Sequence, residues 1–177
     1  MGASQEFISL TETMHGSVKH EILPMTEYDT ISFYWNGVSM FYHDKHGIDF
    51  LLDLANVTLT YLAARMNTSK GMLIVNLVSL HRKKNAGYAG LSDDPWFNFR
   101  SASQFGVTPY QGCLVRLGDK YQRYANLYHD ASLEQVNEKI EDTLFDLAAY
   151  CLIAVCLYRE IPQANRQFFD ATFDNES

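Results

Sequence analysis

Apolar residues recur at helical spacing over most of the chain. Residues 47–66, 70–84, 111–128 and 132–160 each carry an apolar stripe of this period, with polar residues between the stripes. A long connection precedes the third stripe, and we expect a short helix within it over residues 96–105. The pattern predicts a mainly α fold.

Residues 27–43 read differently, because β-branched and aromatic residues dominate there. Asn36-Gly37 divides this stretch, and Asn-Gly is the strongest short turn signal for a β-hairpin. The sequence therefore predicts an N-terminal β-hairpin before the helices.

Composition and charge limit the class of protein. The chain has 177 residues with a formal net charge of -7, which suits one globular domain and argues against direct nucleic-acid binding. Three cysteines without a paired spacing predict no disulfide framework. No signal peptide is visible, and the longest apolar run, residues 147–158, is too short to span a membrane. We expect a soluble cytoplasmic protein.

A row of carboxylates marks the start of the last predicted helix. Glu138, Asp142 and Asp146 are spaced i, i+4, i+8, which drifts by only about 40° per step, so their side chains share one strip. Like charges at this spacing destabilise a helix, and a divalent cation would offset the repulsion. A metal site therefore competes with a solvated acidic face as the interpretation.

The preceding helix presents cations at similar spacing. Arg116, Asp119, Lys120 and Arg123 fall at i, i+3, i+4 and i+7, again on one face. These cations could form plain salt bridges with the carboxylate row, or the two helices could hold a polyphosphate between them. The residues alone leave both interpretations open. Aromatic residues such as Trp96 and Phe99 are expected to anchor the long connection rather than to stack on a base.

Four segments resemble a known family. The segment VRLGDKYQR (115–123) is similar to the R-I-x-D-K-x-x-R helix of the nucleotide-modification-associated domain 1 family, which comprises phage and bacterial relatives of the MazG-like nucleotide pyrophosphohydrolases. The segment VNEKIEDTLFDLAAY (136–150) resembles that family's V-x-E-x-I-x-D-T-L-x-D-L-A-x-Y helix. KNAGY (84–88) and Asn98-Phe99 resemble two further segments, with Gly87 where the family has Asp.

The resemblance implies a single domain built around a MazG-like helical bundle. Residues 67–160 would form the bundle, residues 1–66 an extension with the hairpin and a helix, and residues 161–177 a tail. It also implies a homo-oligomer.

The implied activity is Mg²⁺-dependent pyrophosphohydrolysis of (deoxy)nucleoside triphosphates, in phage nucleotide metabolism within the host cytoplasm. The resemblance implies that Glu138, Asp142 and Asp146 are catalytic residues and metal ligands, and that Asp119 is a further ligand or orients Lys120. It also implies a set of substrate-binding residues: Lys84, Asn98, Arg116, Lys120 and Arg123.

One feature of the MazG-like enzymes is missing from the sequence. No Glu occurs between Tyr28 and Leu133, so the E-x-x-E pair on the helix before the carboxylate row is absent. A protein that binds or sequesters a nucleotide without cleaving it would keep the remaining pattern. A helical interaction module is the third hypothesis, because charged helix faces also suit a protein partner.

Overall fold

The protein is mainly helical, as the sequence predicts. The structure, a computed structural model, describes residues 3–16, 25–89, 94, 96–130, 132 and 139–162. Its elements are α1 (Ala3–Gly16), α2 (Glu27–Phe41), α3 (Lys45–Arg65), α4 (Lys70–Ala89), α5 (Phe97–Arg100), the 3₁₀ helix η1 (Ser101–Phe105), α6 (Pro109–His129) and α7 (Ile140–Glu160).

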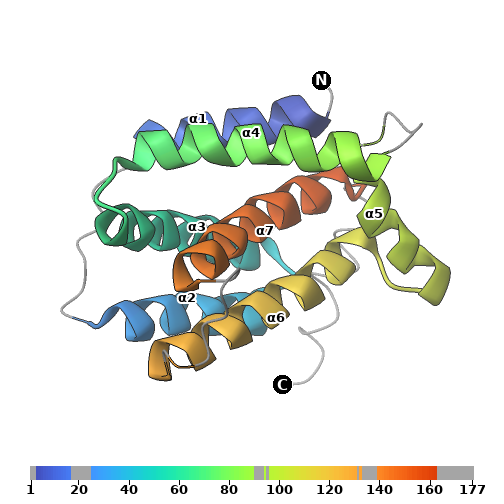
Figure 1. The fold of residues 1–177 in the computed structure, drawn as a ribbon. Helices are drawn as coiled ribbons and strands as arrows, with labels where there is room; N and C mark the ends of the chain where they lie inside the picture. The colour runs from blue at the N-terminus through green and yellow to red at the C-terminus, as the bar shows by residue number, and fades with distance from the viewer. Residues whose placement is uncertain are drawn as a thin grey trace, which may run out of the picture.

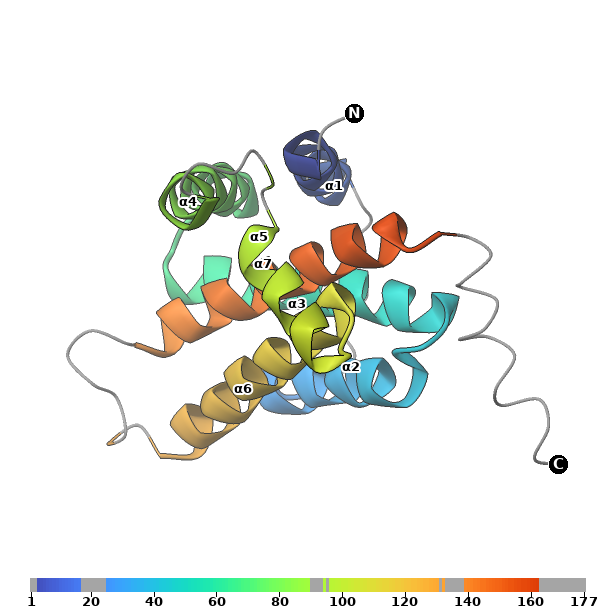
Figure 2. The same ribbon diagram turned by 90° about the vertical axis from the view of Figure 1, so that its right-hand side faces the viewer.

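The helices stack in layers of two. α1 and α4 lie side by side on top in Figure 1, α3 and α7 form the middle, and α2 and α6 lie below them. The end-on view in Figure 2 shows the same order and places α5 across one end of the stack. The short α5 segment therefore lies where α4, α6 and α7 come together.

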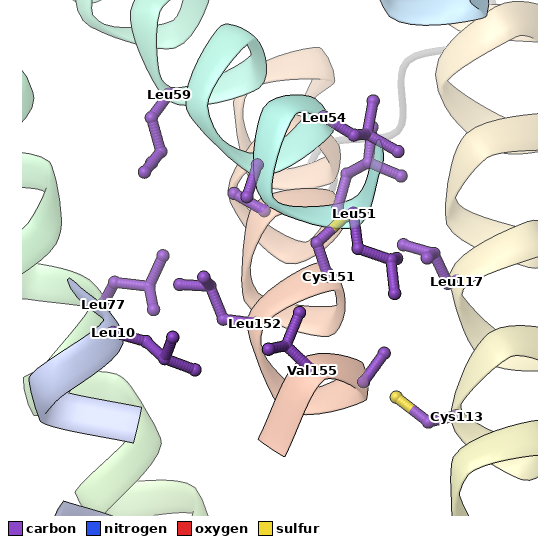
Figure 3. Packing of buried hydrophobic residues seen from close by; sticks show 14 of the residues in the cluster. Leu10, Leu51, Leu54, Leu59, Leu77, Cys113, Leu117, Cys151, Leu152 and Val155 are labelled. Carbon is purple, nitrogen blue, oxygen red and sulfur yellow. The ribbon is translucent and has the colours of Figure 1, made fainter. Parts of the chain in front are cut away.

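The middle layer contributes much of the hydrophobic core. Cys151, Leu152 and Val155 of α7 are fully buried, and Figure 3 shows them among side chains from the other helices. Leu51 and Leu117 reach them from α3 and α6 in the same view. Because α7 is covered by both outer layers, its sequence is apolar almost all round beyond its first turn.

α3 and α4 each begin directly after a residue whose side chain caps the first turn of the helix. The Asp44 carboxylate accepts hydrogen bonds from the N–H groups of His46 (2.7 Å) and Gly47 (3.2 Å) at the start of α3. The Ser69 hydroxyl accepts one from the Met72 N–H at 3.2 Å, so Ser69 caps α4.

The predicted β-hairpin is wrong, because residues 27–41 form helix α2. Ile31 and Val38 are buried seven residues apart, which is two helical turns and places both on one face of α2, whereas a strand would send them to opposite faces. Thr26 caps the helix by accepting a hydrogen bond from the Asp29 N–H at 3.1 Å. Gly37 is required for close packing rather than for a turn, since a Cβ there would lie 2.2 Å from the Phe50 ring.

A charged contact ties α2 to its neighbours. Glu27, the first residue of α2, accepts hydrogen bonds from Arg65 Nε (2.9 Å) and from the Tyr124 hydroxyl (3.1 Å). The hydrogen bond to Glu27 raises the pKa of the Arg65 guanidinium. The contact joins α2, α3 and α6 at one end of the stack.

Helix α3 is long and apolar enough to cross a membrane by length and composition, but 56% of the relevant window is buried inside the fold. That burial is typical of the core helix of a soluble protein, and the structure is compatible with one.

Candidate functional site

The two helices singled out by charge pack against each other through an ion pair. Lys120 Nζ of α6 lies 2.9 Å from Asp146 Oδ2 of α7, and each side chain retains about a quarter of its exposure. A partly exposed pair of this kind stabilises a fold by about 1 kcal/mol or less. The pair therefore shows that the predicted cationic and acidic faces meet, without requiring a ligand.

The predicted carboxylate row is only partly present on α7. The helix begins at Ile140, with Lys139 in extended conformation as its N-cap, so the prediction of a helix from residue 132 is wrong at this boundary. Asp142 Oδ2 accepts the Lys139 N–H at 3.1 Å, which gives Asp142 a capping role. Glu138 lies outside the described residues.

The described residues do not form a Mg²⁺ site by themselves. Among them, no group of three or more His, Cys, Asp or Glu side chains gathers in one place. Asp146 is bound by Lys120, Asp142 caps its helix, and Asp119 is exposed on α6. Mg²⁺ needs few protein carboxylates when phosphate oxygens complete its shell, so these residues fit a metal that arrives with a phosphate better than a resident one.

A pocket of about 140 Å³ opens beside this ion pair. Its walls come from α1, α4, α7 and the segment around α5, and α6 contributes Arg116. Three residues predicted as site residues from separate parts of the sequence line it: Asn98, Arg116 and Asp146. The fold thus brings together an amide, a guanidinium and a carboxylate at one hollow.

The other predicted residues lie elsewhere. Arg123 is half-buried on α6 and, like Asp119, does not line the pocket. Lys84 belongs to α4, but its side chain is outside the described part of the structure. Lys120 reaches the pocket only through its contact with Asp146.

The rings of Phe7, His81 and Trp96 line part of the pocket, and the first two are stacked. The imidazole of His81 lies 4.1 Å from the Phe7 ring at an interplanar angle of 17°, and 5.1 Å from the Trp96 ring. Burial, assisted by the nearby Arg82, lowers the pKa of His81 to about 4, so the imidazole is neutral at pH 7. The stack is therefore an uncharged wall.

The segment carrying Trp96 is held in place by charged contacts. Arg100 binds Asp94 through Nε and Glu160 of α7 through Nη2 (2.9 Å). Asp94 also accepts the Trp96 N–H at 3.0 Å. Burial alone would raise the pKa of Asp94, but the hydrogen bonds from Arg100 and Trp96 lower it below its ordinary value.

Sequence reasoning did not place Trp96, Phe99 or His81 in a pocket. Trp96 and Phe99 are buried and anchor the connection, as expected, but they also line the pocket, where Arg116 lies 6.0 Å from the Phe99 ring centroid. His81 carries no motif, and only the aromatic cluster around Trp96 could have drawn attention to this region.

A second hollow lies on the other side of α6. This groove, of about 400 Å³, runs between α2 and α6 and is lined mainly by Trp35, Val38, Tyr42, Leu114 and Val115. No charged residue lines it within the described chain. Ser39 and Gln111 are the polar aliphatic residues among those lining it, and the rest of its described lining is apolar, aromatic or glycine.

Comparison with protein-family models, with curated proteins and with solved structures finds no match to this chain. The site must therefore be interpreted from its own geometry.

Proposed function

We propose that this protein binds a nucleotide, with the base ring in the pocket and the phosphates over its charged rim. One observation carries the proposal: Asn98, Arg116 and Asp146 come from three separate segments and converge on one aromatic-walled pocket. Aromatic walls with a few placed polar groups are typical of small-molecule sites.

The charged groups suit the phosphate end of such a ligand. Arg116 is exposed at the rim, where a guanidinium can bind phosphate oxygens with two parallel hydrogen bonds. Lys120 is one ion pair away, and a phosphate could replace the Asp146 carboxylate as its partner. The structure thus places two cations beside the pocket mouth.

The test is a binding panel. Calorimetric titration of the protein with nucleoside mono- and triphosphates, without Mg²⁺, should show saturable binding of at least one nucleotide. Arg116→Met and Lys120→Met should each weaken it by roughly 10-fold or more, because a charged hydrogen bond is lost. Lys45→Met is the matched control, since Lys45 lies exposed at the start of α3 and lines no part of the pocket. Equal affinity in all three variants would contradict the proposal.

Mg²⁺-dependent pyrophosphohydrolysis is the second candidate function. It is favoured by Asp142 and Asp146, which are spaced i, i+4 on α7 next to Lys120. The test adds Mg²⁺ and follows pyrophosphate release. Asp142→Asn and Asp146→Asn are the preferred variants, because Asn keeps an acceptor for the helix cap while removing the charge. Binding without product release in the unmodified protein would leave sequestration as the function.

Three finer expectations go with this proposal. They are a MazG-like arrangement of the helices after residue 66, a homo-oligomer and a cytoplasmic location, in the host cytoplasm if the protein is phage-encoded. Analytical sedimentation of the purified protein tests directly whether it forms a homo-oligomer.

A further inference from the structure

We infer that a segment of this chain itself, residues 163–177, binds in the groove between α2 and α6. This contact is independent of nucleotide binding at the pocket. Three observations carry it: the apolar lining of the groove, the place where α7 ends, and the aromatic residues that follow α7 in the sequence.

The groove exposes apolar surface. Val115 is 65% exposed and Tyr42 39% exposed, and no charged residue lines the groove within the described chain. The half-buried ring of Trp35 also lines it and is stacked on Tyr121 at 4.9 Å. Removing apolar surface from water is favourable, and contiguous apolar surface is typical of interaction sites. The groove therefore fits an occupant that is apolar and aromatic rather than charged.

The end of α7 lies beside this groove. Tyr158, in the last turn of α7, packs edge-on against Tyr110 with the ring centroids 5.4 Å apart. The Tyr110 hydroxyl in turn donates a hydrogen bond to the backbone carbonyl of Tyr42 at 2.7 Å, and Tyr42 lines the groove. The ring of Tyr110 therefore bridges the last turn of α7 and the groove. Because Ile161 is extended and Pro162 cannot continue a helix, the chain leaves α7 at this point.

The sequence after Pro162 contains a matching occupant, because Phe168, Phe169 and Phe173 fall within residues 163–177. Phe168 follows Pro162 by six positions, and six extended residues span about 20 Å, more than the width of a tyrosine ring. A tethered segment also has an effective concentration in the millimolar range, so even weak contacts of its phenylalanine rings keep it bound. A second copy of the chain at micromolar concentration has no such advantage.

The experiment measures acrylamide quenching of tryptophan fluorescence in the full chain, without any nucleotide. Of the two tryptophans, Trp96 is fully buried, so the quenching reports mainly Trp35 in the groove. A variant that combines Phe168→Ser, Phe169→Ser and Phe173→Ser should raise the quenching constant by about 2-fold or more, because the tethered segment no longer covers Trp35.

A matched control removes three acids of the same segment and keeps its phenylalanines, by combining Asp170→Ser, Asp174→Ser and Glu176→Ser. This control should leave the quenching constant unchanged. Val115→Asp alters the groove instead of the segment. It should raise the quenching constant as the phenylalanine variant does, because a carboxylate is costly to cover with phenylalanine rings.

Equal quenching in the phenylalanine variant and the unmodified protein would overturn the inference. Quenching that falls as the protein concentration is raised would also overturn it, because it would assign the groove to a second copy of the chain. Neither result depends on the nucleotide titration, which tests the pocket separately.

Discussion

The two hollows on either side of α6 show how one helix can support very different surfaces. Arg116 lines the pocket, whereas its neighbours Leu114 and Val115 line the groove. The pocket also has an amide, a carboxylate and a neutral imidazole among its lining residues, and the groove has no charged side chain among the described residues. The polar lining of the pocket therefore comes from α4, α5 and α7 as well as from α6.

Exposure separates the two hollows further. Val115 in the groove is 65% exposed, whereas Trp96 and Phe7 in the pocket are fully buried. A larger side chain introduced in the groove therefore has room to point into solvent, whereas one introduced in the pocket fills it. Paired substitutions, one in each hollow, can test whether only the pocket binds a ligand.

The largest effect is expected when the pocket is filled, with the filled groove as the comparison. Ala149→Phe places a ring in the pocket and should weaken nucleotide binding by at least about 100-fold, because ring and ligand cannot share the space. Ser39→Phe, its counterpart in the groove, should leave affinity unchanged. Calorimetry measures both, with circular dichroism to confirm folding. Binding that survives in Ala149→Phe would place the ligand elsewhere.

A smaller effect is expected on the stability of the fold at acidic pH, and it should come from His81 in the pocket. The pKa of His81 falls from 6.5 to about 4 in the folded protein, so between these values only the unfolded chain takes up a proton. Stability should therefore decline as the pH falls below 6.5, by about 2 kcal/mol at pH 5 from this residue.

Urea unfolding at pH 7 and pH 5 measures this decline. His81→Gln should flatten the difference between the two pH values. His46→Gln is a charge-matched control, because His46 lies exposed at the start of α3. An unchanged pH dependence in His81→Gln would show that other groups cause the acid sensitivity.

The smallest effect is expected on the stability of the fold, from a substitution of Gly118 beside the groove. A Cβ on Gly118 would lie 3.5 Å from Trp35 Cη2, which is ordinary van der Waals contact. Because glycine weakens a helix interior, Gly118→Ala should stabilise the fold by about 0.5–1 kcal/mol in thermal unfolding. Ala149→Gly on the pocket side should destabilise it by a similar amount. A destabilised Gly118→Ala protein would mean that α2 and α6 pack more closely than the structure shows.

Much of the helical fold could be predicted from sequence periodicity and caps. α3 and α6 lie within two residues of their predicted bounds, whereas α4 begins where predicted but continues five residues further, to Ala89. Asp44, Ser69 and Thr108 each cap a helix that begins directly after them. α2 could not be predicted, because Asn36-Gly37 signals a turn locally. The tertiary reason for Gly37 is the ring of Phe50, which lies thirteen residues further on.

The candidate site was predictable in part. Arg116 and Asp146 could be found from charge spacing, and Asn98 from the resemblance, because each belongs to a short recognisable segment. His81 and Trp96 could not, since their role depends on α1 folding back so that Phe7 stacks on the imidazole. Long-range packing of this kind leaves no trace in local sequence.

The position of α7 has a consequence for synthesis on the ribosome. It is the last described helix in chain order, yet it packs against α1, α3, α4 and α6. Domains generally fold as units, with N-terminal parts emerging first. Here the earlier helices emerge from the ribosome before α7, whose core residues pack between them. A chain stalled before residue 140 should therefore remain a target for chaperones and proteases until translation resumes.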